Sequence, residues 1–385
     1  MPQFSELLGI LSNSLPLHKS RLVCLARLIM SLMLIGTVNL TKVALSFGGE
    51  AQNESRYRRL RRFFAQVKMD FDQIATIVIV LLNINIDEPW ILIFDRTRWD
   101  LGESANNVLV LSLSLGDIAV PLFWKHIEKR GNSHAHDRIE ILERFFRVFP
   151  NVKIHCVLGD REFASSEFML YFIGKDIPFC IRVKDNCYAV SSKGRRVRLD
   201  SCCRRLTEGE MWYGKKPYVL WGNKITLVAL KIDGDLVVLA TTLNPLEALP
   251  LYAKRWEIET SFAALKCRGF CLEDTHMTKP DRIEKWFAVL AIAFAWAYRT
   301  GQCLEKKKPT PTKNHGRKIM SCFRRGYDCI RQTLFDYSHP LKRFGNQLQQ
   351  LFKSPPHPPF GHLLPPGEAK TYEKIHFLSC TLIKP

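Results

Sequence analysis

Three observations in the sequence predict an α/β protein with a mixed β-sheet. First, three apolar or β-branched runs after residue 88 are separated by Gly, Asn and Asp, which is typical of a three-strand meander: WILIFD, NVLVLSLSLG and IAVPLFW. Second, helical and strand patterns then alternate in HDRIEILERFFRVF, VKIHCVLGD, REFASSEFMLYFIG and PFCIRV. Third, residues 187–246 change to short strands broken by turn residues, which indicates a β-rich insertion. Hairpin strands followed by alternating helices and strands form a mixed sheet.

The regions around this core have a different texture. Residues 1–85 have helix-length apolar patterning, and the Lys- and Pro-rich EKKKPTPTK near residue 308 is interpreted as a linker. We therefore expect five segments: a helical N-terminal region (1–85), the first part of the α/β core (86–186), the β-rich insertion (187–246), the rest of the core (247–303) and a basic C-terminal region with a poorly ordered Pro-rich tail (304–385).

The charge of the chain indicates a polyanionic partner. With 56 Lys+Arg against 37 Asp+Glu, the net charge is +19, and a surface this basic is typical of proteins that bind nucleic acid. Residues 299–385 hold 16 Lys/Arg and 5 Asp/Glu, which gives 16 − 5 = +11. A second basic run, SRYRRLRRFF, predicts DNA contacts by Arg58, Arg59 and Arg62. A basic surface without a dedicated partner is the alternative.

Membrane insertion and secretion are not expected. The longest apolar stretch, LVCLARLIMSLMLIGTVNL, contains Arg27 and is followed by Lys42, which favours a buried helix over a membrane segment. The N-terminus has neither a positively charged start nor a small-residue cleavage site. Twelve cysteines without an export signal indicate reduced thiols and a cytoplasmic protein.

Two aspartates follow predicted strands. Asp95 is expected to end the strand ILIFD, and Asp160 comes one glycine after the strand IHCVL. A carboxylate at the carboxyl end of a buried strand points into the crevice where α/β sheets place ligands. Taken alone, each aspartate is more often a turn or cap residue, but the two together, ahead of an acidic helix, predict a site for a hard metal ion.

A third carboxylate, Glu259, lies on a helix predicted from Leu251 to Lys266. At about 100° per residue, four side chains fall within an arc of about 60°: Tyr252, Arg255, Glu259 and Lys266. A solvated face with i,i+4 ion pairs would explain Arg255 and Glu259, but not the phenol and the second cation.

This set of residues suits phosphodiester cleavage. Asp95, Asp160 and Glu259 can hold two Mg²⁺ or Mn²⁺ ions about 3.5–4 Å apart. Tyr252, Arg255 and Lys266 would then bind phosphates of the strand being cut.

The sequence resembles the DDE transposases of the insertion-sequence type-four family, which are bacterial cut-and-paste elements. Tyr252-x2-Arg255-x3-Glu259-x6-Lys266 is similar to that family's Y-R-E-K pattern, and FDRTRWDLG and LGDREFAS resemble the segments around its first and second catalytic Asp. The resemblance covers about residues 15 to 335.

The resemblance implies an RNase H-like core interrupted by a β-rich insertion, with Asp95, Asp160 and Glu259 as catalytic metal ligands. It also implies binding to terminal inverted repeats, strand transfer into target DNA and a homodimer on double-stranded DNA. Relatives stack a flipped base on an aromatic residue of the insertion, and Trp221 or Trp212 lies in the corresponding region. A nuclease of the same fold that does not transpose and a domesticated DNA-binding protein are the alternative functions.

Overall fold

The computed structural model describes residues 2–48, 50–128, 131–314, 316 and 318–335. The Pro-rich tail that we expect to be poorly ordered lies outside the described residues. Contacts divide the chain into two compact units: residues 86–262 form one, and residues 1–85 with 263–385 form the other.

The unit of residues 86–262 is built on a mixed sheet. In the described part of the chain this sheet has 11 strands, in the order β3-β2-β1-β4-β5-β11-β10-β9-β6-β7, with β8 paired to β10. The strands are β1 Trp90–Leu101, β2 Ser104–Ser114, β3 Ala119–His126, β4 Ile154–Gly159, β5 Phe179–Val183, β6 Tyr188–Val190, β7 Arg196–Arg198, β8 Met211–Tyr213, β9 Tyr218–Leu220, β10 Asn223–Ile232 and β11 Asp235–Thr241. The first three are antiparallel, whereas β4 is parallel to both β1 and β5. The predicted α/β class with a mixed sheet is confirmed, and the arrangement is compatible with an RNase H-like core.

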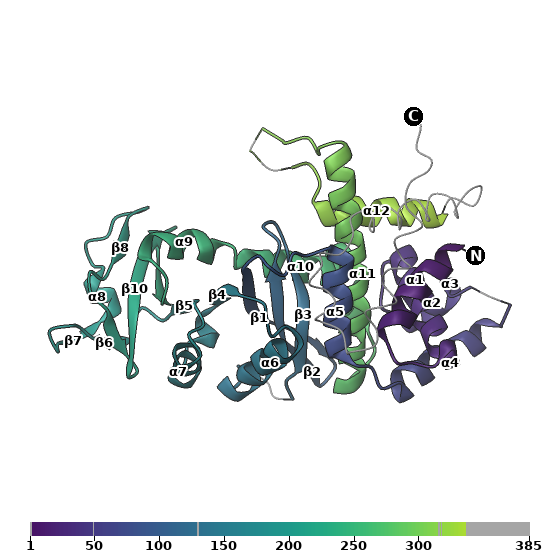
Figure 1. Cartoon of the computed structure of the whole chain (residues 1–385), viewed down its shortest axis with the longest axis horizontal. Helices are drawn as coiled ribbons and strands as arrows, with labels where there is room; N and C mark the ends of the chain where they lie inside the picture. Colours follow the sequence, from purple (N-terminus) through teal and green to yellow (C-terminus); the bar gives the residue numbers. More distant parts are fainter. Residues whose placement is uncertain (1, 49, 129–130, 315, 317, 336–385) are drawn as a thin grey trace. The chain divides into compact units, whose positions relative to one another are not determined.

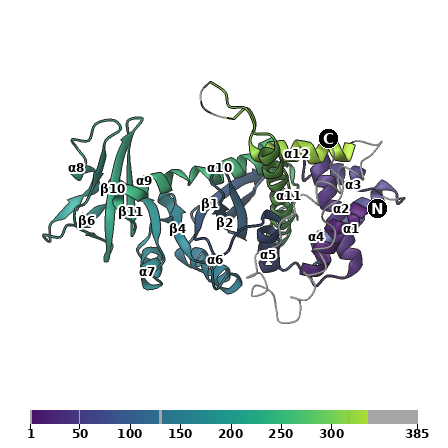
Figure 2. The same cartoon turned by 45° about the horizontal axis from the view of Figure 1, so that its top comes forward.

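Five helices and one short turn accompany the sheet in the described part of this unit. They are α6 Ala135–Val148, α7 Ser166–Gly174, α8 Leu199–Cys202, α9 Pro245–Ala253 and α10 Trp256–Ala263, with a 3-10 turn η1 at Arg161–Phe163. Helix α6 packs on the meander through Phe145, whose ring contacts those of Trp90 and Phe123. Figures 1 and 2 show α9 beside β10 and α10 beside β1 and β2, one after the other along the sheet.

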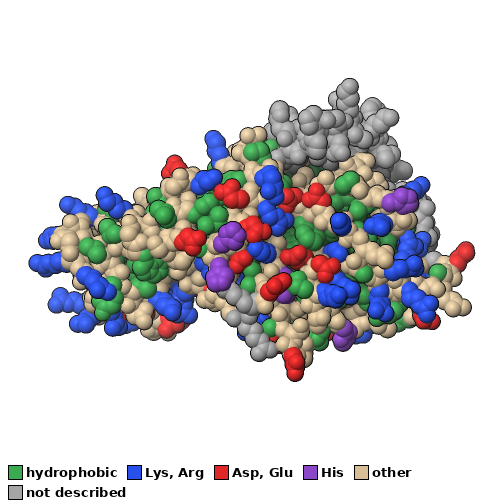
Figure 3. All heavy atoms as spheres, turned by 90° about the horizontal axis from the view of Figure 1, so that it is seen from below, with side chains coloured by type: hydrophobic (Ala, Val, Ile, Leu, Met, Phe, Trp, Pro, Cys, Tyr) green, Lys and Arg blue, Asp and Glu red, His purple; other side chains and the backbone are tan. Residues whose placement is uncertain are grey.

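The β-rich insertion continues the core sheet. Its strand β11 pairs antiparallel with β5 through Val238↔Val183 to Thr241↔Cys180, and β10 pairs with β11. Nine exposed Lys and Arg side chains lie in this part of the chain, and Figure 3 shows blue side chains gathered over its outer end. They are Lys193, Arg195, Arg196, Arg198, Arg204, Arg205, Lys215, Lys216 and Lys224.

The other unit is helical. Its elements are α1 Pro2–Ser14, α2 Lys19–Ile35, α3 Leu40–Ser46, α4 Asn53–Gln66, α5 Phe71–Leu82, η2 Ala264–Arg268, η3 Leu272–Asp274, α11 Pro280–Lys307 and α12 Cys322–Phe335. Helix α12 crosses α11 at two glycines: a Cβ on Gly326 would overlap the carbonyl oxygen of Ala297, and one on Gly301 that of Cys322. Only glycine allows the two backbones to approach this closely.

Apolar helices occur in this unit. The apolar stretch around Arg27 forms α2, where most of the apolar side chains are buried. Among the described residues, α11 is long and apolar enough to span a membrane, and α2 with α3 would pass as a bent pair. In α11, 83% of the apolar window is buried inside the protein, which is the pattern of a core helix.

Three local expectations are wrong. Strand β1 does not end at Asp95 but continues to Leu101, because residues 95–101 pair with β2 from Asp95↔Val110 to Leu101↔Ser104. The segment 251–266 is not one α-helix: it breaks after α9, and η2 is a π-helix. The residues interpreted as a linker begin as the last turn of α11, where Glu305 accepts hydrogen bonds from Thr310 and Lys318.

Candidate active site

Two aspartates come from adjacent strands of the sheet. Asp95 is in β1, and Asp160 directly follows β4. The parallel pairing of these strands ends with Phe94 opposite Gly159, so Asp95 and Asp160 occupy the next position on each chain. Asp160 precedes η1 and makes no capping hydrogen bond with its side chain.

The third carboxylate comes from a bent helical segment. Tyr252 lies near the end of α9, Arg255 in the following turn and Glu259 in α10. The turn is tight because the amide of Arg255 donates to the carbonyl oxygen of Tyr252, at 2.9 Å, and that of Glu257 donates to Lys254, at 3.0 Å. These i→i−3 bonds replace the regular helical ladder, so the 100° spacing expected for the stripe does not hold here.

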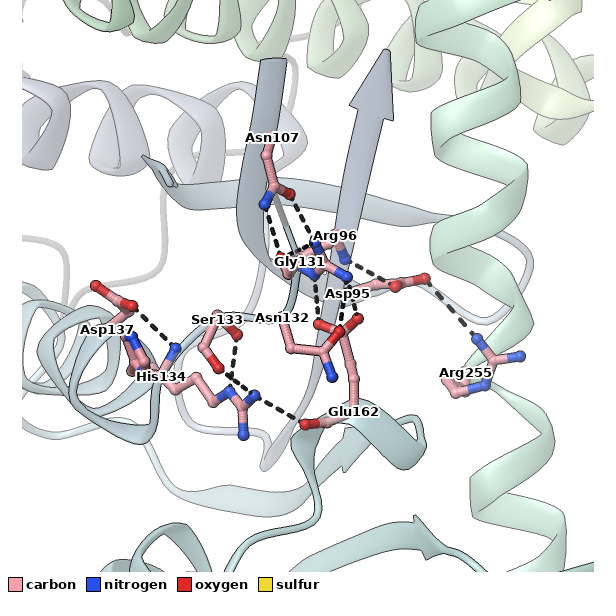
Figure 4. Close-up of polar contacts among 11 residues, drawn as sticks. Asp95, Arg96, Asn107, Gly131, Asn132, Ser133, His134, Asp137, Glu162 and Arg255 are labelled. Carbon is pink, nitrogen blue, oxygen red and sulfur yellow. Dashed lines mark hydrogen bonds and ion pairs between the residues drawn. The ribbon is translucent and has the colours of Figure 1, made fainter. Parts of the chain in front are cut away.

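Arg255 lies between two of the carboxylates. Its Nη2 donates to Oε1 of Glu259 at 2.8 Å, and its Nη1 lies 3.8 Å from Oδ2 of Asp95. Figure 4 shows Arg255 reaching Asp95 from the helical segment. The guanidinium also lies 4.7 Å from the ring centroid of Trp256, a cation–π contact. Asp95 and Glu259 are therefore joined through one shared cation.

Two buried donors at this site lack acceptors within the described chain. The hydroxyl of Tyr252 and Nε of Arg255 make no hydrogen bond there, although the two residues are only 8% and 7% exposed. Burying an unpaired polar donor is unfavourable by about 1–3 kcal/mol, so native structures normally pair it with protein, water or a ligand. Tyr252 also interacts electrostatically with Asp160, and burial raises the pKa of its phenol. These donors point to an anionic ligand beside the aspartates.

Asp95 is poorly stabilised as an anion. Burial raises its pKa to about 6, and the neighbouring Glu162 and Glu259 act in the same direction. The backbone amide of Arg96 and the charge of Arg255 oppose that rise only partly. A cation placed beside Asp95 would stabilise the charged carboxylate and lower its pKa.

Helix α10 is anchored by its opposite edge. Oε2 of the buried Glu257 accepts hydrogen bonds from the amides of Leu115 and Gly116, at 3.1 and 3.2 Å. One turn later, Ser261 exchanges hydrogen bonds with the backbone of Ala119. These contacts fix α10 on the β2–β3 hairpin and so fix the place from which Glu259 extends.

Three further residues were expected at this site, and each belongs to another segment of the chain. Lys266 is in the π-helix η2 of the helical unit, with its Nζ 3.0 Å from Oε1 of Glu273. Trp221 occupies the two-residue turn between β9 and β10, where it has φ 49° and is 38% exposed. Trp212 instead packs its ring edge against Tyr218.

The basic run SRYRRLRRFF lies on α4. Arg58 is exposed and pairs with Glu54, whereas Nη2 of Arg59 donates to the carbonyl oxygen of Ser20. Arg58 and Arg62 line a surface pocket together with Arg61 and Arg282. Of the three arginines expected to bind DNA, Arg58 and Arg62 thus share one basic hollow.

The sequence reasoning missed two residues beside the aspartates. Arg96 follows Asp95, Glu162 lies two residues after Asp160, and the two side chains form a two-point ion pair with both distances 2.6 Å. Both residues belong to the quoted motifs FDRTRWDLG and LGDREFAS. The available signal was a pair of residues of opposite charge, Arg96 and Glu162, each within two residues of one aspartate.

The residues present fit a divalent cation by their chemistry. Asp95, Asp160 and Glu259 offer only carboxylate oxygens, which Mg²⁺ and Mn²⁺ prefer. In the described part of the chain no three acidic, His or Cys side chains lie close enough to hold one ion. Arg255 occupies the position between Asp95 and Glu259, and the Glu259 side chain is 41% exposed.

One family model of protein domains matches part of this chain. Residues 119–296 match the family model described as a transposase DDE domain. This segment includes Asp160 and Glu259, while Asp95 precedes it. No curated protein matches the chain. The match supports a DDE transposase family, and thus an enzyme of DNA cleavage and transposition with DNA as its partner. DDE transposases generally use divalent metal ions.

Proposed function

We propose that this protein is a cut-and-paste DNA transposase of the insertion-sequence type-four kind, with Asp95, Asp160 and Glu259 as its catalytic carboxylates. The observation that carries the proposal is that the Tyr252 hydroxyl and the Arg255 Nε are buried and have no acceptor among the described residues, beside the two aspartates that come directly after the parallel ladder of β1 and β4. A phosphodiester supplies the acceptors these donors lack and the negative charge that Arg255 attracts.

The three carboxylates would hold two Mg²⁺ or Mn²⁺ ions. When bound, such ions polarise the scissile phosphate and increase the nucleophilicity of an attacking water or 3′-hydroxyl. The protein's part is to place the carboxylates. Asp95 and Asp160 extend from neighbouring strands, and Glu259 extends from a helix anchored by Glu257 and Ser261.

Tyr252 and Arg255 bind the phosphate of the cut strand. The Tyr252 hydroxyl and the Arg255 Nε donate to phosphate oxygens, while the two Nη atoms remain available to Asp95 and Glu259. Lys266 contacts a neighbouring phosphate once DNA is bound.

Positive surfaces outside the active site bind the rest of the DNA. Arg58, Arg59 and Arg62 on α4 contact terminal inverted repeats, and the exposed cations of the insertion contact DNA near the cut. Trp221, exposed in its turn, stacks on an unpaired base there. The protein acts as a homodimer on two DNA ends, in the bacterial cytoplasm and associated with the nucleoid.

Cleavage of the element's own ends tests the proposal. Full-length protein with Mg²⁺ or Mn²⁺ should nick and join double-stranded DNA that carries its terminal repeats. Asp95→Asn and Glu259→Gln should reduce both steps to background, whereas Asp100→Asn, an exposed residue on the same strand, should not. Equal activity of the parent and Asp95→Asn proteins would exclude the catalytic assignment.

A strand-transfer assay separates transposition from the action of a plain nuclease. With precut terminal ends, the parent protein should join the 3′-hydroxyl to a target duplex. Cleavage without any joined product would instead support a non-transposing nuclease with the same carboxylates.

A further inference from the structure

We propose that Arg96 and Glu162 are positioning residues that fix Asp95 and Asp160 relative to each other. The proposal rests on the proposed function, because it assigns these aspartates to the active centre. Arg96 and Glu162 are not proposed to contact the DNA. Their role is to set the relative positions of Asp95 and Asp160, which act on it.

The backbone does not set this geometry by itself. The ladder between β1 and β4 ends at Phe94↔Gly159, one residue before each aspartate. Beyond that point β1 stays in the sheet by pairing with β2, while the other chain turns into η1. The backbone ladder therefore does not include the two aspartates themselves.

The ion pair of Arg96 and Glu162 links the two segments beyond this ladder. Nε and Nη2 of Arg96 donate to Oε1 and Oε2 of Glu162, each at 2.6 Å, and the two side chains are 15% and 17% exposed. A two-point pair between a guanidinium and a carboxylate fixes orientation as well as distance. It spans from the residue after Asp95 to the second residue after Asp160, as Figure 4 shows for Asp95, Arg96 and Glu162.

Both partners are held in place by further contacts. Nη1 of Arg96 donates to Oδ1 of Asn107 and to the carbonyl oxygen of Gly131, and Nη2 also donates to Oδ1 of Asn132. All five N–H groups of the guanidinium therefore have acceptors. Arg96 has no donor left for a phosphate, in contrast to Arg255, so it supports the site without binding DNA.

The backbone of Glu162 is fixed by a second arginine. The buried Arg138 donates from Nη2 to the carbonyl oxygens of Glu162 and Ser133, at 2.8 and 2.7 Å. Its guanidinium lies 4.9 Å from the ring centroid of Phe163. Glu162 is thus held at its side chain by β1 and at its carbonyl by α6, which leaves little freedom for Asp160 two residues earlier.

A merely structural ion pair would behave differently from a positioning pair. Replacing a buried ion pair by neutral residues often changes stability little, because the desolvation of the charges offsets their attraction. If Arg96 and Glu162 act through the aspartates, metal binding and cleavage change more than stability does, and the two residues act as one unit.

The experiment uses full-length Arg96→Gln, Glu162→Gln and the double variant, with Arg98→Gln as the matched control. Arg98 lies two residues along the same strand with its side chain 45% exposed. Mn²⁺ binding is measured by the loss of the free-ion electron paramagnetic resonance signal, beside cleavage, DNA affinity and thermal unfolding. Each single variant should lose about 10–100-fold in Mn²⁺ affinity and in cleavage rate, as for other residues that orient metal ligands. DNA affinity and the Arg98→Gln protein should match the parent.

The double variant should be no worse than Arg96→Gln, because either change alone breaks the pair. Parental Mn²⁺ affinity in folded Arg96→Gln protein overturns the proposal; if that variant fails to fold, the same result in Glu162→Gln does so. Asp95→Asn separates the two levels of inference. If it loses Mn²⁺ binding while Arg96→Gln keeps it, only the positioning role fails; if Asp95→Asn also keeps it, the metal assignment of the proposed function fails.

Discussion

Asp95 and Arg96 are consecutive residues of β1, and their side chains leave opposite faces of the strand. On one face, Asp95 meets Arg255, whose Nε has no partner in the described chain, beside the equally unpaired hydroxyl of Tyr252. On the other face, every donor of Arg96 has an acceptor. Burial is similar on the two sides, but only one side has its hydrogen bonds completed.

This contrast separates a binding surface from its support. A buried polar network that is fully paired rigidifies the structure, whereas a partly paired one is unfavourable until a ligand completes it. We call the side of β1 around Asp95 the open face, because its donors are not all paired, and the side around Arg96 the closed face. The unpaired donors of the open face lower stability but are available to a ligand. The closed face holds the same strand in register. Mutations on the two faces should therefore affect activity and stability in different proportions.

The largest effect on the open face is expected from Arg255→Ala. It removes the cation shared by Asp95 and Glu259 and a donor to the phosphate, so cleavage should fall by about 10²–10³-fold, as when a preorganised donor is lost. Single-turnover cleavage of terminal-repeat DNA measures it. Arg255→Lys, which keeps the charge but not the planar fork, should fall between the parent and Arg255→Ala. A parental rate in Arg255→Ala would contradict the role of this face.

A smaller effect is expected from Tyr252→Phe, in activity only. The lost hydroxyl has no partner in the described chain, so the melting temperature should stay constant or rise. Cleavage should fall about tenfold or more, since a hydrogen bond to a charged group contributes about 1.5–3 kcal/mol. Tyr171→Phe is the matched control, because its hydroxyl already donates to Glu143. A clear loss of stability in Tyr252→Phe would show that the Tyr252 hydroxyl has a hydrogen-bond partner within the protein.

The smallest effect concerns pH. Burial raises the pKa of Asp95 from 3.8 to about 6, so the folded state binds this proton more tightly than the unfolded state. The contribution of Asp95 to stability therefore falls as pH rises from 3.8 to about 6. With a chelator present, Asp95→Asn should lack this decline and melt above the parent at pH 7, and Asp100→Asn should melt like the parent. If the melting temperatures of the parent and Asp95→Asn proteins changed identically with pH, Asp95 would not be an unfavourably buried carboxylate.

Local patterns were sufficient for the mixed α/β class. The meander, the amphipathic α6 and the buried β4 all have short-range signals that match their environments. The length of β1 was missed because its second half alternates charged and buried residues, RTRWDL, and is held as a strand only by pairing with β2. The break at Arg255 was missed for a similar reason. No residue there disfavours a helix, and the contacts of Glu257 and Ser261 with the β2–β3 hairpin accompany the bend.

The candidate site was predictable only in part. The spacing of Tyr252, Arg255 and Glu259 placed them together without knowledge of the fold, because they are close in sequence. Arg96 and Glu162 are 66 residues apart, and their pairing depends on β1 lying beside β4. A contact of this kind is set by topology, which a single sequence does not state.

The pairing of β11 with β5 limits how this chain can be shortened. It also limits how the insertion could have been acquired. If residues 187–246 were removed as a cassette, β5 would become an edge strand with bare amides and carbonyls along four paired positions, Val183 to Cys180. Such an apolar edge is a template for association between molecules. Gain or loss of the insertion therefore requires that another segment cover the edge of β5 at the same time. A shortened protein needs either a new strand paired with β5 or a charged residue on β5 that prevents association.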